Sequence, residues 1–192
     1  LRPHDETFAS SGWVTAFSIE LVLYAIGTVF VIFMMVSDRA VTMHKTAASV
    51  DPLSGMFNRR GFAEIGAKVI AREAAARRSV TVMIFDIDHF KSINDRFGHP
   101  AGDEILKLFS TVVVSKLRVG DLSGRVGGEE FAALLACPLE EGVVVAERVR
   151  AAFKKSNIKC EDGPVDTTVS IGVAGGPAGT ELDVLLAAAD TA

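Results

Sequence analysis

The sequence predicts an α/β fold of the α+β type, in which one apolar helix precedes a small domain of strands and helices. Three observations support this prediction. A stretch of 24 residues near the N-terminus carries a single charged side chain, the segments that follow have the order βαββαβ, and 49% of all side chains are apolar while 23% are charged. This composition excludes a disordered chain, and two cysteines are too few for a disulfide framework.

Residues 13–36 form the apolar stretch, and Glu20 is the single side chain in it that is charged at neutral pH. As a helix the stretch would be roughly 36 Å long, enough to cross a hydrocarbon core of about 30 Å. Glu20 falls near one end, where a carboxylate can reach the membrane interface. Continuous apolar character favours a span in the lipid bilayer over a buried core helix. A cleaved signal peptide fits less well, because the stretch is long and no small-residue cleavage site follows it.

The basic residues on the two sides of this stretch predict its orientation. On the C-terminal side lie Arg39, Lys45, Arg59 and Arg60, whereas the N-terminal side has Arg2 beside Asp5 and Glu6. The positive-inside bias therefore predicts an extracytoplasmic flank at 1–12, a transmembrane helix at 13–36 and a cytoplasmic remainder. In that reducing compartment Cys137 and Cys160 are expected to be free thiols, and their spacing does not suggest a metal site.

Residues 37–50 are polar, contain no Gly or Pro, and predict a helical connector. The domain that follows, 51–192, has 142 residues, which is enough for one hydrophobic core. It carries 17 basic and 20 acidic side chains, so no nucleic-acid partner is expected.

Each element of the domain follows from a local pattern. Asn58 is a good N-cap for a helix whose apolar side chains recur on one face. An apolar, β-branched run predicts the first strand, and Pro100 predicts the first turn of a longer helix, where its missing N–H is harmless. Gly127 and Gly128 lie between two strand-like segments and predict a hairpin, because such turns need positive φ. The predicted helices are 59–78, 87–98, 100–118, 140–155 and 181–192, and the predicted strands are 80–86, 123–126, 131–136 and 165–174.

The order βαββαβ defines a split βαβ, or ferredoxin-like, core with additional helices. Right-handed crossovers in such a core place the first and third strands side by side and antiparallel at the centre of the sheet. The end of the first strand at Asp86 then lies beside the start of the third at Glu129.

Carboxylates that meet in this way repel one another unless a cation lies between them, and oxygen ligands suit Mg²⁺. Asp86, Glu129 and the backbone carbonyl of Ile87 are therefore candidate metal ligands. Taken singly, a strand-end Asp and a hairpin Glu are more often solvated residues, so the prediction depends on the fold that brings them together.

Five further residues have properties that suit a bound nucleotide. Gly127 and Gly128 permit close approach of a triphosphate, although a hairpin needs glycine in any case. Lys91 can neutralise phosphate charge, although a lysine is by default an exposed surface residue. Asn94 and Asp103 offer an amide and a carboxylate that together match a purine edge with both acceptor and donor groups. Their alternative roles are a turn former and an acid in the first turn of a helix.

Three strings and the spacing between them resemble the GGDEF family of diguanylate cyclases. They are DPLSGMFNRR at 51–60, FDIDHFKSINDRFGHPAGDE at 85–104 and RVGGEEF at 125–131. The signature reads GGEEF, an active variant in that family, and Ser54 and Met56 replace the more usual Thr and Leu. The resemblance covers 51–192 and implies the palm-like nucleotidyl cyclase version of the predicted fold.

The resemblance implies that two GTP molecules condense to cyclic di-GMP with release of pyrophosphate. It implies that Asp86, the Ile87 carbonyl and Glu129 bind Mg²⁺, with Mn²⁺ as an alternative ion, and that Glu129 also activates the ribose 3′-hydroxyl. Lys91 would stabilise charge at the phosphates. The protein would accelerate the reaction by positioning the nucleotides and by electrostatic stabilisation from the metal. It would contribute little covalent chemistry of its own.

The resemblance also assigns the remaining substrate contacts. Asn94 and Asp103 would recognise guanine, His99 would contact substrate, and Gly127 and Gly128 would lie against the nucleotide. Each domain holds one GTP, so a productive complex requires a homodimer of domains.

A second site is suggested by Arg118 and Asp121, which match the R-x-x-D product-inhibition motif of the family at the expected distance before Gly127. Arg148 would be a secondary contact to the same cyclic di-GMP. By themselves these residues have simpler roles, because Arg118 can complement a helix C-terminus, Asp121 can begin a turn and Arg148 can be an exposed helical arginine.

Two alternatives to an enzyme remain: a catalytically silent receptor for cyclic di-GMP or GTP, and a structural membrane anchor, which leaves the motif spacing unexplained. Family members usually continue past the last helix with a basic segment, so the chain is expected to be a fragment that is truncated at both ends. The expected location is the bacterial inner membrane, with the domain in the cytoplasm.

Overall fold

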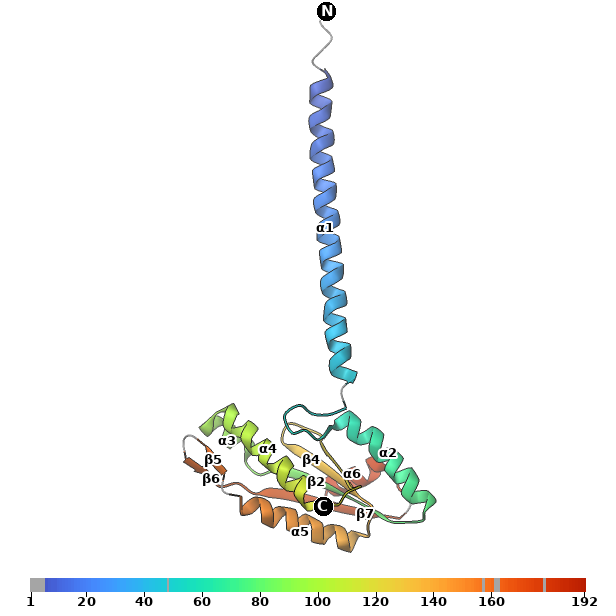
Figure 1. Ribbon diagram of the computed structural model, residues 1–192, viewed down its shortest axis with the longest axis vertical. Helices are drawn as coiled ribbons and strands as arrows, with labels where there is room; N and C mark the ends of the chain where they lie inside the picture. Colours follow the sequence, from blue (N-terminus) through green and yellow to red (C-terminus); the bar gives the residue numbers. More distant parts are fainter. Residues whose placement is uncertain (1–5, 48, 157, 161–162, 178) are drawn as a thin grey trace, which may run out of the picture. The chain divides into compact units, whose positions relative to one another are not determined.

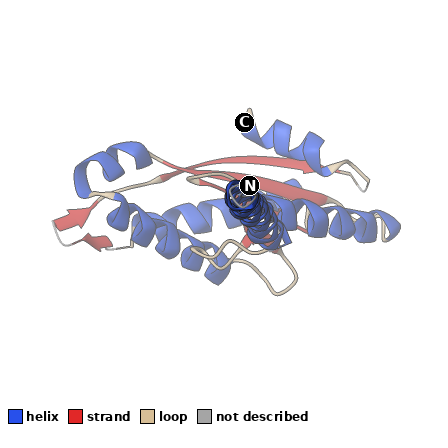
Figure 2. Cartoon of the chain, turned by 90° about the horizontal axis from the view of Figure 1, so that it is seen from above, coloured by secondary structure: helices blue, strands red, loops and turns tan. Residues whose placement is uncertain are grey.

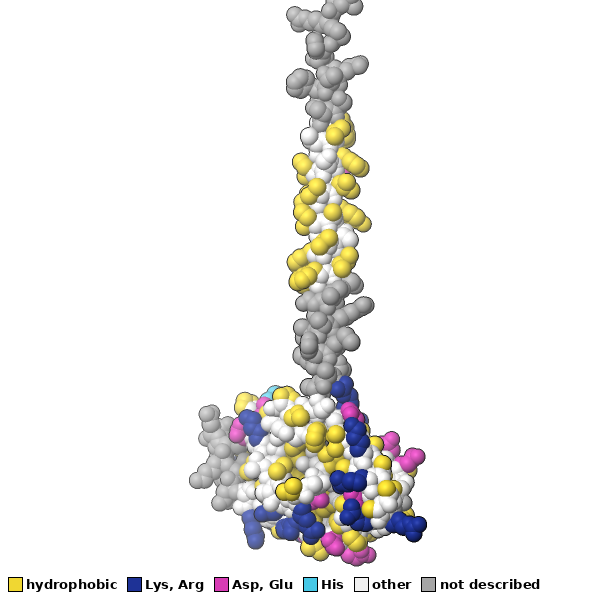
Figure 3. Space-filling view, turned by 45° about the vertical axis from the view of Figure 1, so that its right-hand side comes forward, with side chains coloured by type: hydrophobic (Ala, Val, Ile, Leu, Met, Phe, Trp, Pro, Cys, Tyr) yellow, Lys and Arg dark blue, Asp and Glu magenta, His cyan; other side chains and the backbone are white. Residues whose placement is uncertain are grey.

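The computed structural model describes residues 6–47, 49–156, 158–160, 163–177 and 179–192. The chain divides into two units, Leu1–Ala48 and Ser49–Ala192. The described residues of the first unit form one long helix, α1 (Glu6–Ala47) (Figure 1). Within it, Gly12–Met34 is long and apolar enough to cross a membrane, and its side chains are exposed, with hydrophobic groups dominating the face seen in Figure 3.

The second unit contains a five-stranded sheet in the order β1-β3-β4-β2-β7. Its strands are β1 (Phe57–Asn58), β2 (Val80–Ile87), β3 (Leu122–Arg125), β4 (Glu130–Leu135) and β7 (Val169–Gly176). Strand β2 is antiparallel to both of its neighbours, β4 and β7, whereas β1 is parallel to β3. The prediction that the strands ending at Asp86 and beginning near Glu129 lie side by side and antiparallel is therefore confirmed.

In the described part of the second unit, five helices pack around the sheet; Figure 2 draws helices in blue and strands in red. They are α2 (Arg59–Ala75), α3 (Phe90–Phe97), α4 (His99–Lys116), α5 (Leu139–Lys154) and α6 (Leu182–Asp190). Asn58 caps α2 as predicted, because its side-chain oxygen accepts a hydrogen bond from the Gly61 amide at 2.9 Å. Gly98, with φ of +80°, separates α3 from α4.

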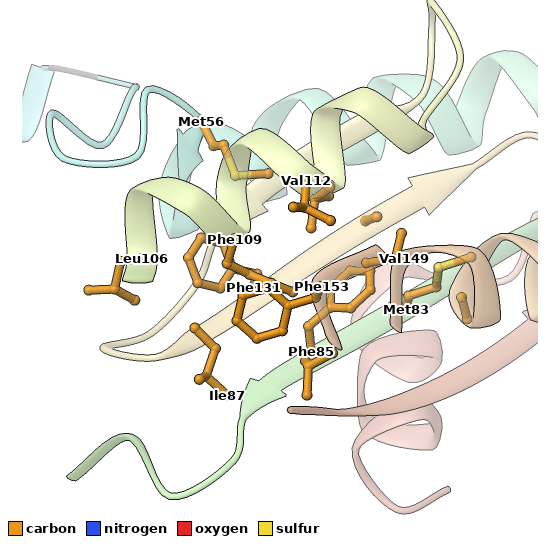
Figure 4. Close-up of a cluster of buried hydrophobic side chains, with 14 of the residues drawn as sticks. Met56, Met83, Phe85, Ile87, Leu106, Phe109, Val112, Phe131, Val149 and Phe153 are labelled. Carbon is orange, nitrogen blue, oxygen red and sulfur yellow. The ribbon is translucent and has the colours of Figure 1, made fainter. Parts of the chain in front are cut away.

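Alternation along the strands divides the apolar side chains between two cores. Met83, Phe85 and Ile87 of β2 pack on the side of α3, α4 and α5, where Phe109 makes edge-to-face contacts with three other phenylalanine rings (Figure 4). Val80 and Val82 pack on the other side, under α2 and α6. Successive side chains of a strand point to opposite faces. Asp86 therefore lies on the same face of the sheet as Val80 and Val82, the side of α2 and α6.

The structure adds two elements that were not predicted and corrects three predictions. The two-residue strand β1 was not predicted, and neither was the separate hairpin of β5 (Ile158–Cys160) and β6 (Gly163–Val165). The predicted strand 165–174 begins instead at Val169. Helix α2 ends at Ala75, three residues before the predicted end, since the chain turns at Arg77 with φ of +54°. Gly127 and Gly128 do not have the positive φ that was expected of them.

Candidate active site

Three polar side chains lie on the α2 and α6 side of the sheet at the end of β2. Asp86 is directly opposite Glu130 of β4 and directly opposite Ser170 of β7. Residues paired in this way have Cα atoms about 4.5–5.5 Å apart and side chains on the same face. The fold therefore brings Asp86 of the second motif to the GGEEF motif. Its direct partner in that motif is Glu130, one residue after the predicted Glu129.

The carbonyl of Ile87 points toward the same place. The Asp88 amide donates to the Thr168 carbonyl of the β7 side at 3.0 Å. Because backbone groups of successive residues in an antiparallel ladder face alternate neighbours, those of Ile87 face β4. The paired register with β4 stops at Asp86 and Glu130, so the next position on that side is Glu129, in the loop.

Desolvation by burial, followed by the negative charge of Asp88, raises the pKa of Asp86. Within the described residues, no lysine or arginine forms an ion pair with Asp86, Glu129 or Glu130. A cation at this position would favour the ionised form of Asp86 and so oppose both effects.

The oxygen donors fit a hard divalent ion of the Mg²⁺ type, which prefers one or two carboxylates together with phosphate oxygens and water. Across the described parts of the chain, no three His, Cys, Asp or Glu side chains form a ready-made cage. Asp86, Glu129 and the Ile87 carbonyl would therefore leave coordination positions for a ligand.

The loop between β3 and β4 is held by two arginines. Arg125 donates to the Gly128 carbonyl at 2.6 and 3.1 Å, and Arg59 donates to the Val126 carbonyl at 2.8 Å. A Cβ atom on Gly127 would lie 2.1 Å from Oε2 of Glu130, whereas one on Gly128 would meet nothing within 4 Å. Glycine at 127 thus makes room for the Glu130 carboxylate, and the exposed backbone at 128 is open to a ligand.

Arg125 also connects this loop to the first motif. Its guanidinium lies 3.3 Å from an oxygen of Asp51, which in turn accepts hydrogen bonds from the amide and hydroxyl of Ser54 at 2.8 and 2.6 Å. Burial raises the pKa of Asp51, but the Ser54 hydrogen bonds and the Arg125 charge outweigh it, so the pKa lies below its ordinary value.

The residues expected to contact a nucleotide base lie on the pair of helices α3 and α4. Lys91 is exposed on α3, and His99 and Asp103 are exposed in the first turns of α4. Asn94 is half-buried between the two helices, and its amide oxygen is buried with no hydrogen-bond partner in the described structure. Since α3 begins three residues after Ile87, the second motif carries both the metal candidates and the base candidates.

Two cavities border the carboxylates. One of about 690 Å³ is lined by Asp86, Asp88 and Ser170 together with parts of α5 and the last residues of α6. The other, of about 380 Å³, lies between Arg59, Glu130 and α6. Both are open at the surface near the end of β2.

The candidate inhibitory residues lie at the other end of β3. Asp121 accepts a hydrogen bond from the Arg118 amide at 2.8 Å, and the Arg118 guanidinium is exposed and lies 3.7 Å from Glu141. Arg148 donates to the carbonyl of Lys116 at 2.6 Å, at the C-terminus of α4. Asp121 thus has the simpler role of turn former, and the helix-end role expected of Arg118 belongs to Arg148. The exposed Arg118 guanidinium remains open to a ligand.

The sequence reasoning missed several residues that shape the site. Glu130 was overlooked although it is part of GGEEF, and its register with Asp86 was the missing information. Asp88 was overlooked because its partners are distant in the sequence: its carboxylate accepts the hydroxyls of Thr168 and Ser170 and joins β2 to β7. No short-range signal could have identified the roles of Arg59 and Arg125, whose partners depend on the folded loop.

Comparisons with known proteins agree with this geometry. Residues 48–192 match the family described as "Diguanylate cyclase, GGDEF domain". The chain is 39% identical over 144 residues to the probable diguanylate cyclase DgcT of Escherichia coli, covering 74% of this chain and 31% of that protein. The chain thus spans about a third of the length of that curated relative.

Two solved structures have similar folds. The GGDEF domain of DgcB from Caulobacter crescentus, solved in complex with c-di-GMP, has a TM-score of 0.72 at 26% identity, with 76% of this chain and 87% of that chain covered. The diguanylate cyclase SiaD from Pseudomonas aeruginosa, solved with its activator SiaC, has a TM-score of 0.71 at 29% identity, with 97% and 75% covered. The mixed sheet with surrounding helices is therefore the fold of these domains.

Proposed function

Since the chain belongs to the GGDEF family of diguanylate cyclases, we propose that its domain condenses two GTP molecules into one cyclic di-GMP and releases two pyrophosphates. The observation that carries this proposal is the register of β2 and β4, which brings Asp86 directly opposite Glu130, the residue that follows Glu129. In the reaction each 3′-hydroxyl oxygen forms a bond to the α-phosphorus of the other GTP, and the bond from that phosphorus to pyrophosphate breaks.

Asp86, Glu129 and the Ile87 carbonyl would hold a divalent ion, Mg²⁺ or alternatively Mn²⁺. When bound, such an ion withdraws charge from the phosphate oxygens and lowers the barrier to displacement of pyrophosphate. Glu129 would also accept the proton of the attacking 3′-hydroxyl. Lys91, exposed on α3 close to the end of β2, would neutralise part of the phosphate charge.

Asn94 and Asp103 would bind guanine, and His99 would contact the same substrate. Gly127 and Gly128 would lie against the nucleotide, where the side-chain-free backbone at 128 leaves space. One domain would hold one GTP, so two domains must meet face to face, and we propose a homodimer as the active form.

Two further properties belong to the proposal. Residues 1–12 would form an extracytoplasmic flank, 13–36 a transmembrane helix and 37–50 a connector, which places the domain 51–192 on the cytoplasmic side of a bacterial inner membrane; the apolar helix supports this. Arg118 and Asp121, with Arg148 as a secondary contact, would bind cyclic di-GMP and inhibit the enzyme. The exposed guanidinium of Arg118 supports this second site.

The test uses the full chain in detergent micelles or lipid nanodiscs, with GTP and Mg²⁺, and measures cyclic di-GMP by chromatography. The chain should form the product, and Glu129→Gln should lower the rate by about 100-fold or more, because both a metal ligand and a proton acceptor are lost. Glu140→Gln, an exposed glutamate of α5, is the matched control and should not change the rate. No product from a chain whose dimer is confirmed would contradict the proposal, and retained cyclic di-GMP binding would then favour the silent receptor.

A further inference from the structure

Asn94 occupies a position that its own hydrogen bonds do not explain. Its Oδ1 is the one side-chain oxygen or nitrogen in the described part of the chain that is buried without a hydrogen-bond partner. A buried, unpartnered amide oxygen is destabilising, so its placement requires another reason. The Nδ2 end of the same amide is not buried in this way, and it is therefore the end that is open to the surface between α3 and α4.

Gly102, in the second turn of α4, is what makes this placement sterically possible. A Cβ atom on Gly102 would lie 2.0 Å from Oδ1 of Asn94, 3.0 Å from its Cγ and 3.1 Å from Cζ of Phe90. Gly102 has no positive φ, so its backbone does not require glycine. Glycine also weakens a helix interior relative to alanine, which leaves the space taken by Asn94 as the reason for its presence here.

The consequence concerns which atoms face a ligand. With the amide oxygen turned against α4, Asn94 presents an N–H donor to the surface, and the exposed carboxylate of Asp103, the next residue after Gly102, presents acceptors. Guanine has adjacent N–H donors at N1 and the 2-amino group, and separate acceptors at O6 and the ring nitrogens. Adenine lacks the N1–H and the 2-amino group, so it cannot satisfy the carboxylate in the same way.

We propose that Gly102 is a positioning residue that fixes Asn94 as a hydrogen-bond donor, and that this arrangement selects guanine over adenine. The inference rests on the proposed function, since it deepens the account of the same base-binding residues. The predicted clash falls on the far end of the Asn94 side chain rather than on backbone. A substitution at 102 should therefore displace Asn94 and leave the fold in place.

The experiment measures binding of the GTP analogue with an α,β-methylene bridge, which cannot react, to the full chain by calorimetry in the presence of Mg²⁺. Gly102→Ala should weaken binding about five- to tenfold, the loss expected for one hydrogen bond, and should narrow the preference for this analogue over its adenine counterpart by a similar factor. Val114→Ala, an exposed position on the same helix, is the matched control and should leave the affinity unchanged.

A double-mutant cycle separates positioning from a general effect on α4. If Gly102 acts through Asn94, then Asn94→Ala and the double variant with Gly102→Ala should bind with the same affinity. Full additivity of the two losses, or unchanged base preference in Gly102→Ala, would overturn the inference while leaving the proposed function intact. Failure of the unmodified chain to bind the analogue would overturn both.

A second measurement does not depend on the stability of the Gly102 variant. In the unmodified chain labelled with nitrogen-15, the side-chain amide signal of Asn94 is identified by its loss in Asn94→Ala. Saturation with the guanine analogue should shift this signal, and saturation with the adenine analogue should shift it less. Equal shifts with the two analogues, or none, would overturn the donor assignment.

Discussion

At the scale of single residues, Asp88 has the clearest structural consequence for the site. Its carboxylate accepts the hydroxyl of Ser170 at 2.7 Å and that of Thr168, and its backbone carbonyl accepts the Thr167 hydroxyl at 3.2 Å. These bonds fix the end of β2 against the start of β7. Burial raises the pKa of Asp86 most, and the Asp88 charge raises it further, so Asp88 both helps to position the candidate metal ligand and makes it harder to ionise.

Asp88→Asn should therefore shift the pH dependence of metal binding. Removing the negative charge lowers the raised pKa of Asp86 toward its ordinary value, so the metal affinity should persist to lower pH than in the unmodified chain. The lost acceptors should cost about 1 kcal/mol of the free energy of unfolding. The measurement is Mn²⁺ affinity by electron paramagnetic resonance as the pH falls. Ser170→Ala, which loosens the same contact and keeps the charge, should not extend binding to lower pH, and an equal extension would contradict the electrostatic explanation.

Residue roles differ in how far the sequence could predict them. Asp86 and Glu129 were predicted to be neighbours because strand order alone implies it. Glu130 needed the register, since one residue decides which side chain faces Asp86. Gly102 needed the contact with Asn94 across two helices, and helical periodicity contains no information about such a contact.

At the scale of elements, the turn at Asp51 supports the loop between β3 and β4 through Arg125. The side chains of Asp51 and Arg125 are 19% and 16% exposed, so their ion pair is shielded from solvent far better than a surface pair. The lowered pKa of Asp51 means that the carboxylate stabilises the fold above its ordinary pKa, and that this contribution is lost as the pH falls through the lowered pKa.

Asp51→Asn should destabilise the domain by about 1–2 kcal/mol at neutral pH, because the Ser54 donors and Arg125 lose a charged partner. The difference in the free energy of unfolding between the unmodified chain and this variant should shrink as the pH falls below about 4. Chemical denaturation at a series of pH values measures both quantities. Glu104→Gln, which breaks an exposed pair with Lys107, is the control and should give a smaller, nearly pH-independent change, whereas a constant difference for Asp51→Asn would refute the linkage.

Long, strongly patterned elements were predicted within a few residues, and short or long-range ones were not. Strand β2 is a continuous apolar run, and Pro100 and Asn58 are local signals for α4 and α2. Strand β1 has two residues and pairs with β3, which begins more than sixty positions later, so no local pattern could reveal it. The loop at Gly127 was assigned a positive φ because the arginines and the Glu130 carbonyl that shape it instead were unknown.

At the scale of the whole domain, β3 joins the two candidate ligand sites. Asp121 immediately precedes this four-residue strand, and the loop that carries Gly127 and Glu129 follows it. At about 3.3 Å per residue, the strand spans roughly 13 Å. A ligand held at Arg118 and Asp121 would therefore be one short strand away from the candidate catalytic loop.

Arg118→Ala should raise the concentration of cyclic di-GMP needed for half-inhibition by about tenfold or more, because a charged contact to the ligand is lost. The initial rate at low product should stay within about twofold of the unmodified chain, since the side-chain partner of Arg118 is Glu141 and not Arg59, Arg125, Asp86, Glu129 or Glu130. Initial rates at increasing cyclic di-GMP give both numbers. Inhibition that is unchanged in this variant would count against the second site.

The alternation of β2 also limits how the domain can vary in length. One residue inserted between Val80 and Asp86 would rotate the carboxylate into the aromatic cluster around Phe109, where an ion has no solvation, while Phe85 would emerge among polar neighbours. An insertion in the turn before Val80 would leave every side chain of β2 on its present face of the sheet. Homologues and redesigned versions of this domain can therefore differ in the lengths of their connections. The number of residues from Val80 to Asp86 must stay the same, because it decides which face of the sheet the carboxylate is on.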